Sequence, residues 1–239
     1  MLSSPPHDPF VLHRLALAPF KASADTKAIE SCIDAVAIVG EETFTAFLQS
    51  QALGPLWLKA IKERDLTDSL PMTLLETLKR QTQSAVCGYM LQEAAMQKAH
   101  QAFETAGIRY ALIKGAAIRE QVFPDPALRP ACDIDILVSP RQRIGAIGAL
   151  VSAGFSLYAS PENISHEANL SDRRSTIDLH WDVMRPGHLR LDIVDQLLAD
   201  RTRIGTFWSI GESAALFLAL VHPAFTKYVN TPHALGDFR

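Results

Sequence analysis

The chain has 239 residues, a formal net charge of −3, and hydrophobic and charged contents of 48% and 21%. These values are typical of a globular protein with a real core, in one large domain or two small ones. They exclude a strongly basic field that would hold a long nucleic acid, and no apolar run is long enough to span a membrane.

The N-terminal part of the chain is predicted to be helical. Apolar residues recur every three or four positions, as on the buried side of a helix, and Gly40 and Gly54-Pro55 interrupt the pattern. Ser69 precedes the longest segment as a capping residue, and Gly107 ends it. The predicted helices span residues 11–17, 26–39, 42–53, 56–64 and 72–106.

After Gly107 the pattern changes to short apolar runs that alternate with helical segments. The predicted strands span residues 108–113, 133–138, 155–159, 164–170 and 175–183. The predicted helices span residues 115–122, 140–151, 191–199 and 212–222. This order predicts an α+β fold with a mixed sheet. We expect an N-terminal helical region (1–106), a core (107–185) and a C-terminal helical region (186–239).

Two carboxylates alternate with branched apolar residues in the predicted strand 133–138. Side chains in a strand alternate between the two faces, so Asp133 and Asp135 should share one face while Ile134 and Ile136 enter the core. Two neighbouring aspartates repel each other, and a hard divalent cation between them removes that cost. The pair therefore predicts a Mg²⁺ site, although a solvated face of an edge strand would also accept it.

A phosphate-binding turn is predicted just upstream of these carboxylates. The apolar run 110–113 leads into Lys114-Gly115 and then into a helical segment. A strand, a glycine turn and a helix start direct backbone N–H groups and a positive dipole end at a phosphate. Arg129 offers a planar fork of donors to the same ligand. Alternatively, Lys114 is an ordinary surface lysine and Arg129 pairs with a nearby aspartate.

These motifs together resemble those of the uncharacterised nucleotidyltransferase family in the polymerase-beta-like superfamily. The resemblance lies in Lys114-Gly115 before a helix, in the segment LRP-x-x-DIDILV and in the segment Asp-Leu-His-Trp at 178–181. It implies a third carboxylate on a later strand, and Asp178 is the residue at that place. Asp182, on the same predicted face, is a weaker substitute, and His180 is expected to be a hydrogen-bonded structural residue.

The resemblance also implies a reaction and its cofactors. The expected activity is transfer of a nucleoside monophosphate from a nucleoside triphosphate, with ATP as the default, to a hydroxyl group. Asp133 and Asp135 would hold the nucleotide-bound Mg²⁺ (or Mn²⁺), and Asp178 would complete a second metal site or act as the base. Lys114, the Gly115 backbone and Arg129 would bind the phosphates.

The acceptor is open at this point: a small molecule, a peptide or a protein all fit. Two alternatives to the enzyme are a catalytically inactive protein that binds a nucleotide or a partner, and a toxin-like transferase that acts on tRNA. The acidic net charge weighs against a large RNA.

The location of the protein follows from its N-terminus and its cysteines. The first residues lack the basic start and apolar core of a signal peptide. Cys32, Cys87 and Cys132 lack metal-site spacing and are odd in number, as expected for reduced thiols. A cytoplasmic protein with no membrane partner is therefore expected.

Overall fold

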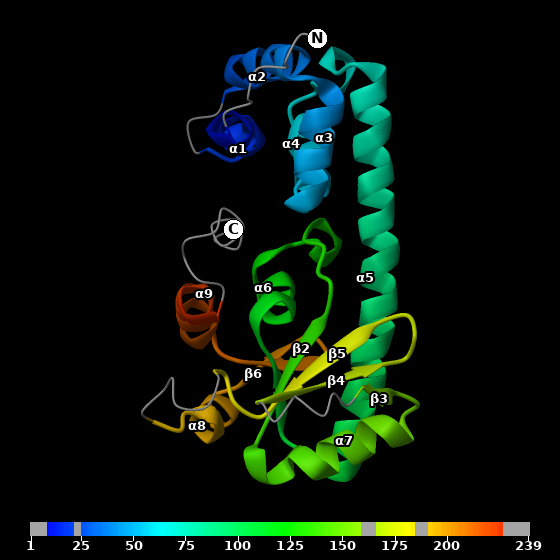
Figure 1. The fold of residues 1–239 in the computed structure, drawn as a ribbon, viewed down its shortest axis with the longest axis vertical. Helices are drawn as coiled ribbons and strands as arrows, with labels where there is room; N and C mark the ends of the chain where they lie inside the picture. The colour runs from blue at the N-terminus through cyan, green and yellow to red at the C-terminus, as the bar shows by residue number, and fades with distance from the viewer. Residues whose placement is uncertain (1–8, 22–24, 159–165, 185–190, 227–239) are drawn as a thin grey trace, which may run out of the picture. The chain divides into compact units, whose positions relative to one another are not determined.

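A computed structural model describes residues 9–21, 25–158, 166–184 and 191–226 of the chain (Figure 1). The chain forms two compact units: Met1–Cys87 with Ala127–Pro130, and Gly88–Pro126 with Ala131–Arg239. The long helix α5, Met72–Ala106, begins in the first unit and ends in the second, and its bounds confirm the predicted range.

The described part of the first unit is built from helices packed around one apolar core. Trp57 is fully buried in this core beside Phe44, and its indole Nε1 donates a 2.8 Å hydrogen bond to the carbonyl of Ala16. The Asp25 side chain caps α2 by accepting a 2.8 Å hydrogen bond from the Ala28 amide. Besides α5, this unit contains α1 (Pro9–Leu17), α2 (Thr26–Val39), α3 (Glu41–Ser50), α4 (Gly54–Lys62) and the 3-10 helices Ala18–Phe20 and Thr67–Ser69.

The described residues of the second unit form a mixed seven-stranded sheet with the order β3-β4-β5-β2-β1-β7-β6. The central pair β2 and β5 is parallel, as is β1 with β7, while the other neighbours are antiparallel. This mixed sheet, with helices before and after it, confirms the predicted α+β fold. The strands are β1 (Tyr110–Leu112), β2 (Ile134–Val138), β3 (Ser156–Tyr158), β4 (Glu167–Ser171), β5 (Thr176–His180), β6 (Thr202–Ile204) and β7 (Phe207–Ser209).

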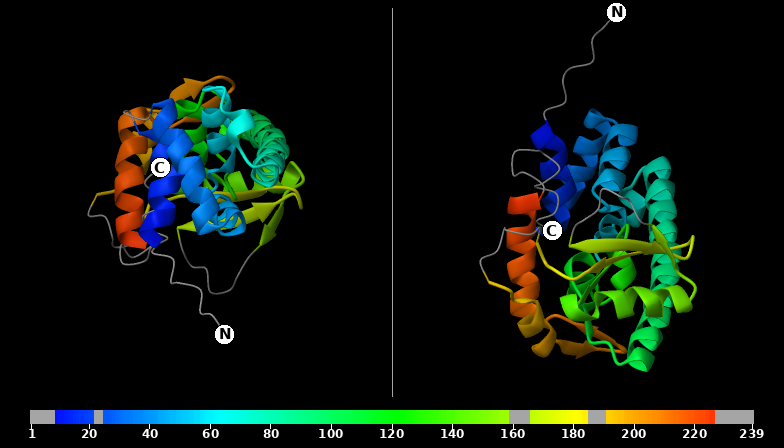
Figure 2. Two further views of the ribbon diagram at one scale, coloured as in Figure 1. Left: turned by 90° about the horizontal axis from the view of Figure 1, so that it is seen from above. Right: turned by 60° about the horizontal axis from the view of Figure 1, so that its bottom comes forward.

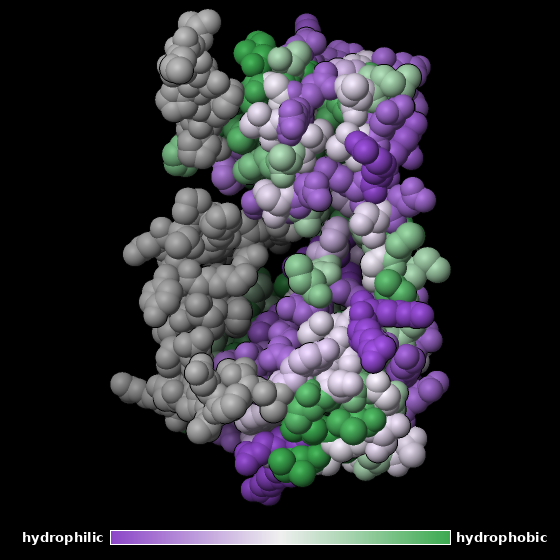
Figure 3. Space-filling view, turned by 45° about the vertical axis from the view of Figure 1, so that its right-hand side comes forward, coloured by the Kyte–Doolittle hydropathy of each residue, from purple (hydrophilic) through white to green (hydrophobic). Residues whose placement is uncertain are grey.

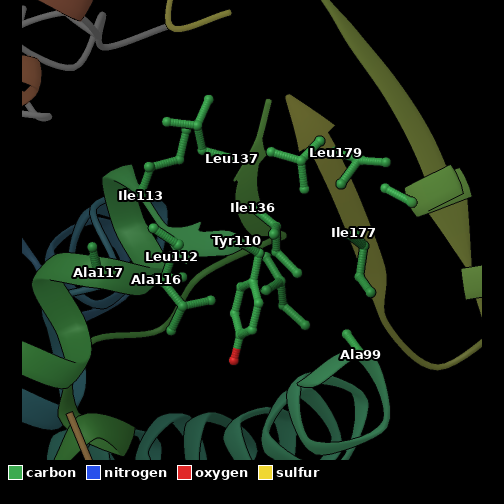
Figure 4. Close-up of a cluster of buried hydrophobic side chains, with 14 of the residues drawn as sticks. Ala99, Tyr110, Leu112, Ile113, Ala116, Ala117, Ile136, Leu137, Ile177 and Leu179 are labelled. Carbon is green, nitrogen blue, oxygen red and sulfur yellow. The ribbon is translucent and has the colours of Figure 1, made fainter. Parts of the chain in front are cut away.

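One face of the sheet packs on the C-terminal half of α5. Figure 4 shows Tyr110, Ile136 and Ile177 on the side of the strands that faces Ala99 of α5. Alternation along β2 and β5 puts Ile134, Val138 and Leu179 on this face too, and all of these side chains are buried. The opposite face is therefore the one that receives the polar residues of these strands.

The remaining helices of this unit are short, except for α9. They are α6 (Lys114–Val122), α7 (Arg143–Ser152), α8 (Val194–Ala199) and α9 (Glu212–Thr226), with a 3-10 helix at Pro140–Gln142 and another, Pro126–Leu128, at the border of the units. The helix α9, orange-red in Figure 2, packs against α6. No helix in the described ranges is long and apolar enough to cross a membrane.

The structure differs from the sequence prediction in its short strands. The hairpin of β6 and β7 turns at Gly205, whose φ of +53° suits glycine, but neither strand was predicted. Strands of three residues are too short for an alternating pattern to be recognised. The predicted strand 164–170 is confirmed from residue 167, whereas residue 166 lies in a bend. Residues 164 and 165 lie outside the described residues, as does residue 159 at the end of the strand predicted from 155.

Hydrophobic side chains gather on the surface over α7 and β3, at the lower end of the view in Figure 3. Ile144 and Val151 of α7 are 72% and 48% exposed, and Leu157 and Tyr158 of β3 are 42% and 61% exposed. This apolar surface contributes none of the polar groups described below.

Candidate active site

Neighbouring strands place a set of polar side chains on the face of the sheet opposite α5. Asp135 of β2 lies in register with Asp178 of the parallel strand β5, and paired residues in a sheet point to the same face. The antiparallel neighbour β4 adds Asn169 opposite Asp178 and Glu167 opposite His180. Strand pairing alone therefore collects acids, an amide and an imidazole over β2, β5 and β4.

Asp135 contacts both a lysine and a histidine. Its Oδ1 lies 2.9 Å from Lys114 Nζ and 2.9 Å from His180 Nε2, and Lys114 Nζ lies 3.2 Å from the same imidazole nitrogen. The Asp135 side chain is 8% exposed and the His180 side chain 1%. Charge-assisted contacts at this depth are strong, because little water competes for them.

Lys114 reaches Asp135 from an unusual backbone conformation. Its φ is +48°, in the left-handed region that side chains other than glycine seldom adopt and that costs about 1 kcal/mol or more. The residue follows Ile113, whose carbonyl accepts a 3.2 Å hydrogen bond from the Ala117 amide of α6 but whose side chain makes no capping hydrogen bond, and Gly115 lies in the first turn of that helix. The strained turn aims the lysine at the carboxylate, and the ion pair offsets its cost.

Asp178 is held from the neighbouring strand. The side-chain amide of Asn169 donates a 2.5 Å hydrogen bond to Asp178 Oδ1. Asp178 and Asn169 are both partly buried, so this contact limits the directions in which the carboxylate can point. The third predicted carboxylate, Asp133, lies in the bend just before β2, since the strand begins at Ile134 and not at 133.

The three carboxylates titrate differently because their surroundings differ. Burial raises the pKa of Asp133 to about 6, and the charges of Asp135 and Asp178 add to the rise. Burial also raises the pKa of Asp178. For Asp135 burial acts in the same direction, but the hydrogen bond from His180 and the charge of Lys114 outweigh it and hold its pKa below the ordinary value. Asp133 and Asp178 therefore hold a proton more readily than an ordinary aspartate, and Asp135 holds one less readily.

We expect Asp133→Asn to stabilise the protein in the absence of divalent metal. Asp133 titrates near 3.9 in an unfolded chain and near 6 in the folded one, so between these values the folded state binds more protons and stability falls as pH rises. Asparagine mimics the protonated form. Since Asp133 is only partly buried, the gain should be about 1–2 kcal/mol at pH 8 and vanish below about pH 4. Thermal unfolding in EDTA at both pH values measures it, and an equal gain at both would contradict it.

His180 connects this set to a second pair of residues. Its Nδ1 lies 3.2 Å from Glu167 Oε2, and His166 Nε2 lies 3.5 Å from the same oxygen. The two imidazole rings are 5.8 Å apart between centroids. Burial lowers the pKa of His166, which favours its neutral form.

Two groups of side chains in the described residues have the spacing of metal ligands. Asp135, Asp178 and His180 each offer a ligand atom, and these atoms lie within 4.8 Å of one another. The same is true of His166, Glu167 and His180. Carboxylate oxygens suit Mg²⁺, whereas imidazole nitrogens suit transition metals.

The sequence analysis proposed six site residues. The structure brings four of them together, namely Lys114, Asp133, Asp135 and Asp178, and Gly115 follows Lys114 in the chain. Arg129 belongs to the segment Ala127–Pro130, which groups with the first unit. The sequence analysis missed Glu167 and Asn169 and gave His180 only a structural role. Glu167 and Asn169 are two residues apart in a predicted strand, so they were expected to share a face. That spacing assigns no function until the strand that pairs with it, and therefore the residues opposite, are known.

Comparison with known proteins gives one strong result. A family model described as "uncharacterised nucleotidyltransferase" matches residues 39–237. No curated protein matches the chain. Among solved structures, the solution structure of the antibiotic-resistance factor ANT(2'')-Ia is similar over 60% of this chain and 77% of that chain, with 13% identity and a TM-score of 0.42.

Proposed function

Because the chain belongs to the uncharacterised nucleotidyltransferase family, we propose that it transfers a nucleoside monophosphate from a nucleoside triphosphate to a hydroxyl group with the help of Mg²⁺ or Mn²⁺. ATP is the default donor. The observation that carries the proposal is the register of Asp135 with Asp178 on adjacent parallel strands, with Asp133 just before the first of them. Such a cluster of acids is costly to bury and is relieved by a cation.

The residues fit a divalent ion of the Mg²⁺ type. Asp135 and Asp178 supply oxygen ligands, and Asp133 lies close enough for its charge to act on both. The ion would neutralise the charge that develops on the transferred phosphoryl group and on the departing pyrophosphate. Asp133 and Asp135 would hold the ion that binds together with the nucleotide, and Asp178 would complete the site of a second metal ion.

Asp178 is also our candidate for the general base. Burial raises its pKa, so its carboxylate is a better proton acceptor than an exposed aspartate. The amide of Asn169 engages Oδ1, which orients the group toward an acceptor hydroxyl. The acceptor proton would pass to this carboxylate while the hydroxyl oxygen attacks the α-phosphorus.

The phosphates of the donor would lie at the start of α6. Lys114 and the Gly115 backbone belong to the first turn of this helix, where the helix dipole favours an anion. Lys114 Nζ now contacts Asp135, and it can turn from this carboxylate to the β- and γ-phosphates when a nucleotide enters. Arg129 is proposed as a further phosphate ligand from the sequence alone.

Labelling with α-³²P nucleotides tests the proposal. The full chain is incubated with each of the four nucleoside triphosphates, Mg²⁺ and pools of small-molecule, peptide and protein acceptors, and transfer is followed by label and by mass shift. We expect transfer that requires the divalent ion. The matched control is Asp195→Asn, which changes an exposed aspartate of α8 and should leave transfer unchanged.

One outcome would contradict the enzyme, a second would contradict its metal requirement, and a third would identify its substrate. Binding of nucleotide without transfer to any acceptor, equal in the wild type and in Asp178→Asn, would indicate a binding protein on the same fold. Transfer that persists in EDTA would remove the metal from the mechanism. Transfer to tRNA and to no other acceptor would keep the reaction and identify a toxin-like enzyme.

Asn169→Ala should lower the turnover number about tenfold and change the KM for the nucleotide little. The amide orients Asp178 without being a ligand itself, and loss of such a partner costs 10–100-fold in related sites. Steady-state kinetics measure the effect, with Ser171→Ala on the same strand as control. An unchanged turnover number would show that Asp178 is oriented by other contacts.

A further inference from the structure

His180 is buried between two acidic side chains, and only one of its nitrogens has a hydrogen bond in the described structure. Nε2 lies 2.9 Å from Asp135 Oδ1 and 3.2 Å from Lys114 Nζ, which itself donates to this carboxylate. We assign the ring proton to Nε2, because the carboxylate only accepts and the shorter contact then becomes a hydrogen bond. Nδ1 then carries a lone pair. It has no hydrogen-bond partner among the described residues, although the His180 side chain is only 1% exposed.

The lone pair of Nδ1 faces another acceptor. Glu167 Oε2 lies 3.2 Å away. His166 Nε2 lies 3.5 Å from the same oxygen, and His166 Nδ1 is also buried without a hydrogen-bond partner in the described part of the chain. Two acceptors at this distance repel each other unless a cation lies between them. A positive charge near Glu167 Oε2, His180 Nδ1 and His166 Nε2 would therefore stabilise this arrangement.

The spacing of these atoms is that of ligands around one small ion. Bonds of 2.0–2.2 Å from a tetrahedral Zn²⁺ to nitrogen and oxygen put neighbouring ligand atoms about 3.4 Å apart. Glu167 Oε2 lies 3.2 Å from His180 Nδ1 and 3.5 Å from His166 Nε2, and all three residues offer ligand atoms within 4.8 Å of one another.

We propose that His166, Glu167 and His180 form a second metal site, for a first-row transition ion such as Zn²⁺, separate from the oxygen-rich Mg²⁺ site of the proposed reaction. Two imidazoles and one carboxylate select a transition ion over Mg²⁺. Three protein ligands leave a fourth position for water or for a group of the acceptor substrate.

The transition ion would affect Asp135 through the imidazole ring of His180. With the metal on Nδ1 and Asp135 on Nε2–H, His180 forms a carboxylate–histidine–metal chain, which fixes the orientation of both groups. Binding of the transition ion would thereby hold Asp135 in place for the proposed transfer. His180 is thus a metal ligand and a positioning residue, and it is given no step in the transfer itself.

Metal binding by the full chain tests the site directly, without any assay of transfer. The protein is stripped with chelator and titrated with Zn²⁺ in a calorimeter in the presence of excess Mg²⁺. We expect one Zn²⁺ per chain, which Mg²⁺ does not displace. His166→Ala and Glu167→Gln should each weaken Zn²⁺ binding more than about 100-fold, because loss of even an outer partner costs 10–100-fold. Asp133→Asn and the exposed Asp195→Asn should bind Zn²⁺ like the wild type.

A second measurement needs no variant at these positions. Histidine ring resonances of the wild type should report, on addition of one equivalent of Zn²⁺, ligation of two rings and a proton retained on one nitrogen of His180. Zn²⁺ binding that survives in His166→Ala and Glu167→Gln but is lost in Asp133→Asn would overturn the site and leave the proposed transfer intact. Zn²⁺ binding as expected, together with no transfer under any condition, would overturn the proposed function and leave the site intact.

Discussion

Replacing Asp135 by asparagine is expected to lower the rate of nucleotidyl transfer about 10³-fold or more. The side chain keeps its size but loses the charge that would hold the divalent ion. Removal of one electrostatic partner of a transition state costs roughly 10²–10³-fold in enzymes, and here the loss of a metal ligand adds to it. The rate of a single turnover with α-³²P ATP measures the effect.

Folding of the Asp135→Asn variant has to be checked beside its activity. Asparagine leaves Lys114 and His180 without their anionic partner in a buried place, so some loss of stability is expected as well. Circular dichroism and thermal unfolding separate a folded, inactive variant from an unfolded one. A folded Asp135→Asn variant with more than about a tenth of the wild-type rate would refute the assigned role of this carboxylate.

Arg119→Ala should lower the free energy of unfolding of the second unit by about 3–5 kcal/mol. Arg119 of α6 is 1% exposed, and its guanidinium contacts Gln92 Oε1, Glu120 Oε1 at 3.4 Å and the ring of Tyr89 at 4.9 Å from its centroid. Removing one partner of a buried ion pair leaves the other charge uncompensated. Burial already raises the pKa of Glu120, and loss of the arginine removes the charge that opposes this rise.

The matched control for this variant is Arg141→Ala, at an exposed arginine before α7, which should change stability by less than about 0.5 kcal/mol. Urea unfolding followed by far-UV circular dichroism compares the two. Arg119→Lys keeps the charge but loses the planar fork, so it should lie between the wild type and alanine. A loss below about 1 kcal/mol in Arg119→Ala would mean that the surrounding residues repack around the gap.

Most of the long elements were predictable because local patterns decide them. The helix from 72 to 106 follows from its apolar period and from Gly107, which ends it, and the helix from 26 to 39 from its apolar period and Gly40. The predicted capping residue Ser69 instead lies in the 3-10 helix Thr67–Ser69. The buried strand β2 follows from its branched residues, although its first residue is Ile134. The strands β6 and β7 were missed because three residues contain too little pattern.

By itself, the sequence determined that Asp133 and Asp135 are candidates for one cation site, since they are two residues apart, and that Lys114-Gly115 precedes a helix. Only the tertiary structure decided which other groups join them. Asp178, His180, Glu167 and Asn169 come from strands whose partners and register depend on the whole sheet, and a shift of one residue in any strand would turn its side chains to the opposite face. The pairing of strands, which no local pattern encodes, therefore decides that Asp178 lies beside Asp135 and that His180 lies between Asp135 and Glu167.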